Sequence, residues 1–331
     1  MKDIALDLGV SLMTVSKALR SHSDISEKTR QRVLKRAQEL DYRPNWIARS
    51  LVTRRTHLVG LVIPDLMHSF FAEVSKGVTR KFEARAYQVV ISNSEEDPDA
   101  EERQIELLLA RSVDGLIVAS AQHSARAPLF HNLDRRGVPY VLIDRLPPGL
   151  DAHYVGGKDD EIGALATSHL LDQGCRRIAH LRGPSVPTGL GRLRGYRRAL
   201  ARHGIEASPD YVASGLHSDN TGYEAMRRLL ALDTPPDGVF CYNDPVAAGA
   251  IKAVLESGLR VPEDIAIVGA GNVHYSDLLR VPLSTVDQSS TLIGEMAADL
   301  LMQCMESKTK VPPRKILIPP RLVVRDSSRR M

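Results

Sequence analysis

The sequence is poor in cysteine and contains no long apolar run. It has three cysteines in 331 residues, Cys175, Cys241 and Cys304, and none of them forms a CxxC pair. This spacing excludes a disulfide framework and a zinc ribbon and is typical of a protein from the reducing cytoplasm. Because no run of about eighteen apolar residues occurs, we expect no membrane-spanning helix and no membrane partner. The first residues also lack the apolar stretch of a signal peptide.

Signatures of common enzyme classes are missing as well. The sequence contains no GxSxG, HExxH or Walker-type phosphate loop, and its eleven histidines show no metal-ligand spacing. A glycine-rich stretch at 189–195 resembles a dinucleotide fingerprint, but it does not open directly from a predicted strand. We therefore predict a protein that is not an enzyme and that needs no cofactor or metal.

Basic charge is concentrated at the start of the chain. Residues 1–56 contain twelve Lys or Arg and six Asp or Glu, whereas the remainder contains 32 basic and 34 acidic residues. A small basic module on a nearly neutral body is typical of a protein that binds the phosphate backbone of nucleic acid. A solvated helical surface would give the same composition, so the charge alone leaves both readings open.

Residues 1–43 have the pattern of a helix-turn-helix module. Helical segments are predicted at 2–8, 12–19 and 27–40, and Gly9 suits the left-handed turn between the first two. We expect Leu12, Met13 and Lys17 to face outward, where apolar side chains can contact thymine methyls and a lysine can contact guanine. Hydroxyl side chains of the same module suit phosphate contacts: Ser11, Thr14, Ser16, Ser26 and Thr29.

From residue 58 onward, short apolar runs alternate with amphipathic stretches. Such alternation predicts parallel sheets covered by helices on both faces. The predicted strands lie at 58–63, 89–92, 115–119, 140–143, 178–181, 239–241 and 265–269, and the helices at 71–86, 100–111, 162–174, 192–203, 222–232 and 246–258. These units are too many for one open sheet, so the predicted fold class is α/β, with two doubly wound parallel-sheet lobes behind a small all-α headpiece. Ligands of such lobes bind at the carboxyl ends of the strands.

The order of motifs along the whole chain resembles the lactose/purine repressor (LacI/GalR-type) family. The matching stretches are 3–19, 43–51, 59–65, 113–115, 243–244, 259–265 and 282–286. The resemblance implies a headpiece at 1–43, a hinge at 44–57, and a periplasmic-binding-protein-like effector and dimerisation domain at 58–331. Within that domain we expect lobe 1 at 58–157 and 290–316 and lobe 2 at 158–288 and 319–331.

The resemblance also implies roles for single residues in DNA binding. It makes Leu12, Met13 and Lys17 base readers, and it places Asn45, Ala48 and Leu51 on a hinge helix that enters the minor groove. A helix of about seven residues is marginal in water and should form only when it is docked. An inserted leucine can kink the duplex. Packing of Leu51 against the body of the protein is the alternative.

By the same resemblance, an effector should bind between the lobes. The implied pocket residues are Phe70, Phe71, Asp144, Arg192, Asn243 and Gln288. Two further candidates depart from the family: His217 stands where the family usually carries an aromatic residue, and Arg145, next to Asp144, is expected to add positive charge. The two phenylalanines could equally be core, and side chains at strand ends could be helix caps. The chain has Gly269-Ala270-Gly271-Asn272 where the family carries an aspartate, so we expect the carbohydrate-like effector to be anionic, a sugar acid or a phosphorylated sugar.

The predicted function is therefore a cytoplasmic transcriptional repressor. It would bind a pseudo-palindromic DNA operator as a homodimer, with half-sites about ten base pairs apart, under control of a small metabolite. The last residues show no apolar heptad repeat, so we expect no appended coiled coil of the kind that makes some relatives tetramers. At the other end, only Met1 precedes Lys2, where the family usually has two further residues, so we expect the natural start to lie upstream. Two alternatives remain open, a two-lobed solute-binding protein and a regulator controlled by a protein co-repressor.

Overall fold

The computed structural model describes residues 1–19, 22, 24–42, 55–122, 128–214 and 218–330. It divides into two compact units, Met1–Thr56 and His57–Met331, which are described separately below. No helix in the described part of the chain is both long and apolar enough to cross a membrane.

The first unit is a three-helix module. Its helices are α1 (Lys2–Leu8), α2 (Leu12–Leu19) and α3 (Glu27–Glu39). Gly9 ends α1 in the left-handed conformation at φ 62°, as its position in the sequence predicted. Six buried side chains from the three helices form the core: Ile4, Ala5, Val15, Ala18, Val33 and Ala37. This small core fixes which faces of α2 remain free.

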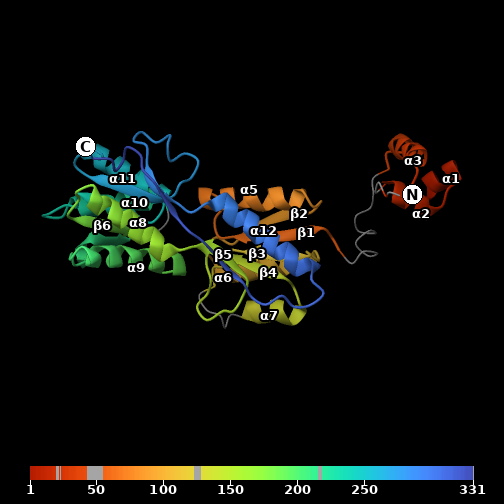
Figure 1. Cartoon of the computed structure of the whole chain (residues 1–331), viewed down its shortest axis with the longest axis horizontal. Coiled ribbons are helices and arrows are strands. Elements are labelled where there is room, and N and C mark those ends of the chain that lie inside the picture. The colour runs from red at the N-terminus through yellow and green to blue at the C-terminus, as the bar shows by residue number, and fades with distance from the viewer. Residues whose placement is uncertain (20–21, 23, 43–54, 123–127, 215–217, 331) are drawn as a thin grey trace. The chain divides into compact units, whose positions relative to one another are not determined.

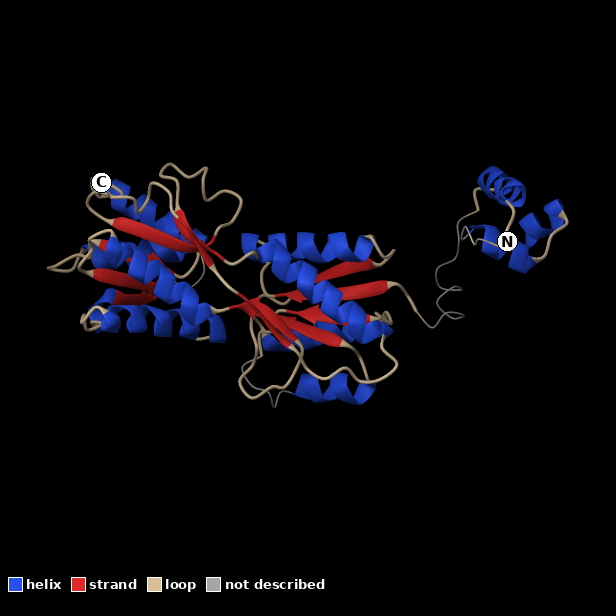
Figure 2. Ribbon diagram, viewed as in Figure 1, coloured by secondary structure: helices blue, strands red, loops and turns tan. Residues whose placement is uncertain are grey.

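The second unit begins with a parallel six-stranded sheet, which we call lobe 1 together with its helices (Figures 1 and 2). The strand order is β11-β5-β4-β3-β1-β2, and every pair in it is parallel. The strands are β1 (Leu58–Ile63), β2 (Gln88–Asn93), β3 (Gly115–Val118), β4 (Tyr140–Ile143), β5 (Tyr154–Gly157) and β11 (Lys315–Ile318). One face packs on α5 (Ser69–Glu83) and α12 (Ser290–Glu306), and the other on α6 (Pro98–Ala110) and α7 (Pro128–Arg136).

Lobe 2 repeats this plan around a second six-stranded sheet of order β12-β10-β9-β8-β6-β7. The strands are β6 (Ile178–Arg182), β7 (Val212–Ser214), β8 (Gly238–Cys241), β9 (Ala266–Gly271), β10 (Ser284–Asp287) and β12 (Arg321–Val323). One face packs on α10 (Asp219–Leu230) and α11 (Asp244–Glu256), and the other on α8 (Asp159–Asp172) and α9 (Pro187–Arg202). A short 3₁₀ turn, η1 (Pro209–Tyr211), precedes β7.

The chain passes between the lobes three times, after β5, β10 and β11 (Figure 2). The sequence prediction did not include strands β5, β7, β10, β11 and β12 or helices α7 and α12. Two further details also differ from it. Strand β11 continues to Ile318, beyond the expected end of lobe 1 at residue 316. The sheet of lobe 2 is not wholly parallel, because β12 pairs antiparallel with β10. After β11 the chain crosses directly into lobe 2, so β12 reaches the edge of that sheet in the opposite direction.

Candidate functional site

Helix α2 presents two large apolar side chains to solvent. Leu12 is 46% exposed and Met13 62% exposed, while Val15 and Ala18 on the same helix are buried in the core. Two exposed apolar side chains at the start of a short helix bury no apolar surface in water. In a major groove they can contact thymine methyl groups. The predicted outward orientation of Leu12 and Met13 is therefore confirmed.

Lys17 lies on the same helix but is not free. Its ammonium group is paired with the carboxylate of Asp24, which also lies 2.9 Å from Nδ1 of His22. The hydrogen bond from Lys17 is the main cause of a lowered pKa of the Asp24 carboxyl group. The sequence pattern gave no signal for this pair, because Asp24 lies in the loop after α2. An approaching guanine must compete with Asp24 for the lysine.

The predicted phosphate-binding hydroxyls form two helix caps. The Ser11 hydroxyl accepts a hydrogen bond of 3.0 Å from the Thr14 amide, and Ser26 accepts one of 3.3 Å from the Thr29 amide. Each pair also shares a hydroxyl–hydroxyl contact of 2.9 Å. Their first role is thus to begin α2 and α3. Ser16 is half-buried on α2. Asn45, Ala48 and Leu51, the predicted hinge residues, lie outside the described residues, as does His217.

Seven of the eight predicted effector residues meet in one cavity between the lobes, which we call the effector cleft. It lies at the carboxyl ends of β1, β4 and β8, and His217 is the predicted member that the structure does not describe. The lining residues are Asp65, His68, Phe70, Phe71, Glu96, Asp144, Arg145, Arg192, Tyr242, Asn243 and Gln288. The sequence reasoning missed Asp65, His68, Glu96 and Tyr242, although Tyr242 directly follows β8 and Asp65 lies two residues after the end of β1.

Arg192 is held in the second turn of α9 and not in the first turn, where the sequence had placed it. Its side chain is 3% exposed. Its Nε donates to Asp159 at 3.1 Å and Nη2 donates to Gln288 at 2.7 Å, while Nη1 donates to the carbonyl of Tyr242. Burial raises the pKa of the Asp159 carboxyl group to about 7. Arg192 therefore has a structural role, tying α9 to its neighbours, beside any contact with an effector.

Arg145 is paired in the same way on the side of lobe 1. Its guanidinium group bonds both carboxylate oxygens of Glu96, at 2.5 and 2.7 Å, and Nε lies 3.3 Å from Asp144. Asp144 adopts a positive φ of 61°, a conformation that residues other than glycine rarely adopt. Burial raises the pKa of the Asp144 carboxyl group. The expectation that Arg145 brings free positive charge to the cleft is wrong, because Glu96 neutralises it.

The remaining groups provide an aromatic wall and a hydrogen bond across the cleft. Phe70 and Phe71 meet edge to face at 5.1 Å and are each 4% exposed, so both belong to the core and to the cavity wall. The Asn243 side chain caps α11 through the Val246 amide at 2.9 Å. Its amide nitrogen lies 2.9 Å from Nε2 of His68, which joins lobe 2 to lobe 1. Asn243 is thus both a cap and a cleft residue.

The effector cleft is almost filled by these side chains. Its volume is about 30 Å³, which is roughly the share of one water molecule in the liquid and far below the ~300 Å³ of a small-molecule site. A carbohydrate can enter only if the lobes or the lining side chains move apart. The described conformation is therefore one in which the protein's own groups satisfy each other.

Comparison with known proteins identifies the family to which the chain belongs. The family description "Bacterial regulatory proteins, lacI family" matches residues 1–45, and "Periplasmic binding protein-like domain" matches residues 167–328. The HTH-type transcriptional repressor PurR of Pasteurella multocida (strain Pm70) is 33% identical over 329 residues, which cover 98% of this chain and 97% of the relative. The chain belongs to the lacI family of bacterial regulatory proteins. It is a DNA-binding transcriptional regulator.

Other transcriptional regulators are similar over the same length. The ribose operon repressor of Escherichia coli (strain K12) is 34% identical, with 96% of this chain and 97% of the relative covered. The Lac repressor dimer bound to operator and the anti-inducer ONPF has a TM-score of 0.87 at 28% identity, and a CelR–cellobiose complex has 0.75 at 32%. Both structures cover 98% of each chain. The named relatives are transcriptional regulators or repressors and none is named as an enzyme.

Proposed function

We propose that this lacI-family regulator is a cytoplasmic repressor that binds its operator as a dimer and is controlled by an uncharged carbohydrate in the effector cleft. One observation supports the proposal most directly. The chain combines a helix that exposes Leu12 and Met13 beside Lys17 with a cleft whose two arginines are already neutralised. The proposed role needs no catalytic step.

DNA binding is proposed to use α2 for base contacts and the hinge for the minor groove. The test is to select bound DNA from a random pool and to titrate the selected site in gel shifts at several salt concentrations. We expect a pseudo-palindrome and an affinity that falls steeply with salt, because phosphate contacts release counterions. Leu51→Ala should weaken specific binding more than non-specific binding if the leucine enters the duplex. No salt-sensitive retention of any selected DNA would overturn the proposal.

The uncharged effector follows from the charges around the cleft. Arg145 faces Glu96 and Asp144, Arg192 faces Asp159, and Asp65 also lines the cavity. Carboxylates thus outnumber guanidinium groups, and an anion would bring further negative charge into a buried site. Carboxylate and amide groups beside an aromatic wall can instead hydrogen-bond sugar hydroxyls. Relatives named for ribose repression and for a cellobiose complex are consistent with this class.

The effector is tested by calorimetry with neutral sugars and matched anionic derivatives. The first pairs are glucose with gluconate and ribose with ribose 5-phosphate. A neutral sugar should bind, and it should change the operator affinity in a gel shift. Tight binding of an acid or a phosphate to this cleft, with none of any neutral sugar, would overturn the uncharged-effector proposal and restore the anionic one. A change in affinity only with a protein partner would favour the co-repressor alternative.

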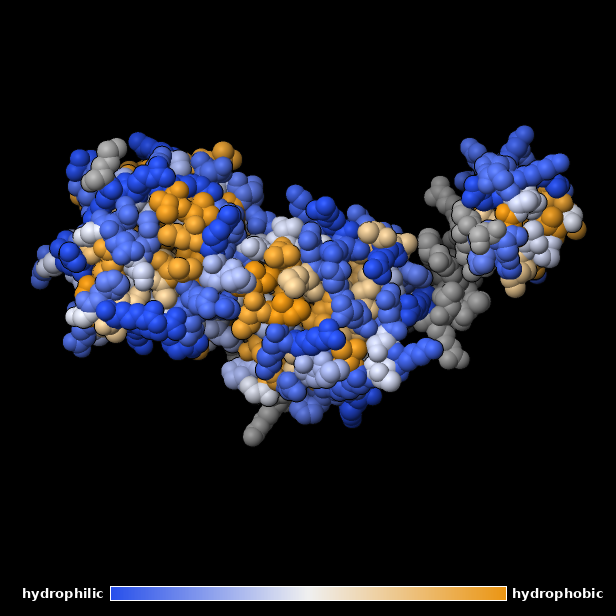
Figure 3. Space-filling view, viewed as in Figure 1, coloured by the Kyte–Doolittle hydropathy of each residue, from blue (hydrophilic) through white to orange (hydrophobic). Residues whose placement is uncertain are grey.

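The dimer is proposed to use an apolar groove on lobe 2. The groove has a volume of about 290 Å³ and is lined by Ile251, Leu255 and Leu279 among others. Leu278 beside it is 77% exposed. Figure 3 shows further apolar patches among the hydrophilic residues of both lobes. A second copy fits because the Lac repressor neighbour is a dimer on its operator. Leu278→Asp with Leu279→Asp should give monomers in light scattering, and Leu190→Asp, on a leucine of α9 that is 43% exposed, should not.

A further inference from the structure

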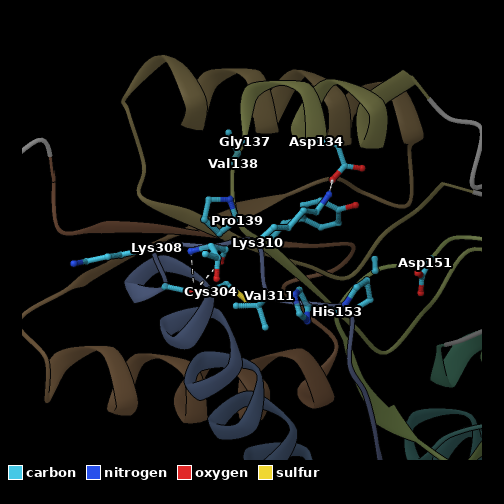
Figure 4. Close-up of a pocket in the computed structure, with 15 residues that line it drawn as sticks. Asp134, Gly137, Val138, Pro139, Asp151, His153, Cys304, Lys308, Lys310 and Val311 are labelled. Carbon is cyan, nitrogen blue, oxygen red and sulfur yellow. Dashed lines mark hydrogen bonds and ion pairs between the residues drawn. The ribbon is translucent and has the colours of Figure 1, made fainter.

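Lobe 1 contains a second and larger cavity, which we call the amino-edge pocket (Figure 4). Its volume is about 370 Å³, within the range of small-molecule sites. It is built where β4, β5 and β11 begin, against the ends of α7 and α12, and so lies at the opposite edge of the sheet from the effector cleft. Nothing in the proposed regulatory role uses this pocket.

The walls of the pocket combine apolar and hydrogen-bonding groups. Val138 and Pro139 line it before β4, and Val311 lines it from the loop after α12. In Figure 4, Cys304 lies on α12, and both Cys304 and His153 lie close to Val311. Nδ1 of His153 accepts a hydrogen bond of 3.2 Å from the Arg314 amide, so the proton of a neutral ring lies on Nε2. Burial lowers the pKa of His153, and the cation of Arg314 lowers it further.

The loop that closes the pocket is basic. Residues 308–315 contain four Lys or Arg and no acidic residue. Lys310 lies 3.5 Å from Asp134, with side chains that are 83% and 51% exposed, and such a long exposed pair is worth little and is easily exchanged. Lys308 makes no ion pair with any described residue, and in Figure 4 its side chain extends away from Cys304. Asp134 and Asp151 also line the pocket, so its two lysines are matched by two carboxylates. The difference from the effector cleft is that these lysines are exposed and at most loosely paired, whereas the arginines of the cleft are held in buried ion pairs.

We propose that the amino-edge pocket binds a small organic anion that carries a phosphate or carboxylate group. The anionic group would pair with Lys310 at the mouth in place of Asp134. The Lys308 side chain, which points away from the pocket in Figure 4, would turn toward the same oxyanion on binding. The rest of the ligand would pack on Val138 and Pro139, with hydroxyls donating to Asp134. The effector cleft and this pocket would then bind ligands of different charge at opposite edges of one sheet.

Cys304 gives a local reporter for the test. It lines the pocket and is partly exposed, whereas Cys175 and Cys241 are buried. Alkylation of Cys304 by iodoacetamide in the full chain is followed by mass spectrometry, with glucose 6-phosphate, gluconate or glucose present. We expect saturable protection by glucose 6-phosphate, by gluconate or by both, at a dissociation constant of about 1 mM or below, and none by glucose. Comparing the two anions identifies whether a phosphate or a carboxylate is preferred.

Variants separate the pocket from a general effect of charge. Lys308→Ala with Lys310→Ala should weaken protection at least about tenfold. Lys315→Ala removes charge from the same segment at an exposed residue that does not line the pocket, and it should leave protection unchanged. No protection by either anion, or equal protection in the double variant, would overturn the proposal. The readout is independent of operator binding and of the effector cleft, so the two proposals can fail separately.

Discussion

Glu101 is the residue whose titration should be most visible in the stability of the protein. It is completely buried on α6, and its carboxylate accepts hydrogen bonds from the Ser120 hydroxyl at 2.8 Å and from the Ala121 amide at 2.5 Å. Burial raises its pKa from 4.5 to about 7 despite these bonds. The protonated form is therefore favoured in the folded protein more than in the unfolded chain.

The sign and size of the effect follow from linkage. Because the folded pKa is raised, the contribution of Glu101 to stability is greatest below pH 4.5 and is lost as the pH rises to about 7. A rise from 4.5 to about 7 corresponds to a loss of about 3 kcal/mol between these limits. Glu101→Gln cannot ionise. Its amide can donate to the Ser120 hydroxyl while its oxygen accepts from the Ala121 amide, so both partners stay satisfied.

The assay is denaturant unfolding of the wild type and Glu101→Gln at several pH values from 4.5 to 8. The variant should gain stability relative to the wild type by about 3 kcal/mol across this range, with most of the change below pH 7. Glu102→Gln, which removes the neighbouring and only half-buried carboxyl group of the same helix, is the matched control. A difference between Glu101→Gln and wild type that stays constant with pH would refute the reasoning.

Three further predictions concern DNA binding, the cleft and the core. Lys17→Ala should weaken operator binding by about 1–3 kcal/mol and non-specific binding by less, and equal losses in competition gel shifts would argue against a base contact. Glu96→Gln leaves Arg145 without its bidentate partner, so the affinity for gluconate should rise relative to glucose in calorimetry, and an unchanged ratio would contradict the charge argument. Gly294→Ala should cost about 1–3 kcal/mol in denaturant unfolding, because the new Cβ would lie 2.2 Å from a backbone oxygen of α5, and a neutral substitution would show that the two helices can separate.

The fold class was predictable because most lobe elements have strong patterns. The apolar runs of β1, β3, β4 and β8 and six of the lobe helices were located correctly, although these six helices begin two to five residues earlier than predicted. Helix α7 and the longest helix, α12, were not predicted. The early turns are polar or proline-containing, with caps such as Asp97 and Asn243, and so carry no apolar period. Strands β7 and β12 have three residues each and depend on the neighbouring strand for their conformation.

The candidate site was predictable in position but not in its charges. Strand ends mark where a ligand can bind, so Asp144, Asn243 and Gln288 could be placed from the sequence and the resemblance. The partner of Arg145 could not be, because Glu96 lies 49 residues away and meets it only in the folded lobe. The glycines at 189–195 likewise have a packing role, since a Cβ on Gly195 would lie 2.2 Å from the Asp160 carbonyl oxygen of α8.

The contacts across the cleft set how strongly an effector must bind to act. Among the described residues, hydrogen bonds that join the lobes there include His68 with Asn243 at 2.9 Å, the His274 amide with Glu73 at 3.0 Å, and Tyr275 with Ser69. Each contributes about 0.5–1.5 kcal/mol net, so these three hold the described conformation by roughly 1.5–4.5 kcal/mol. A ligand can shift the equilibrium between conformations only by the difference in its affinity for them. A sugar that forms a few more hydrogen bonds in one arrangement of the lobes than in the other can outweigh the free energy of these contacts. The weakness of the closing contacts, and not the strength of the ion pairs within each lobe, is what allows a small neutral molecule to control the protein.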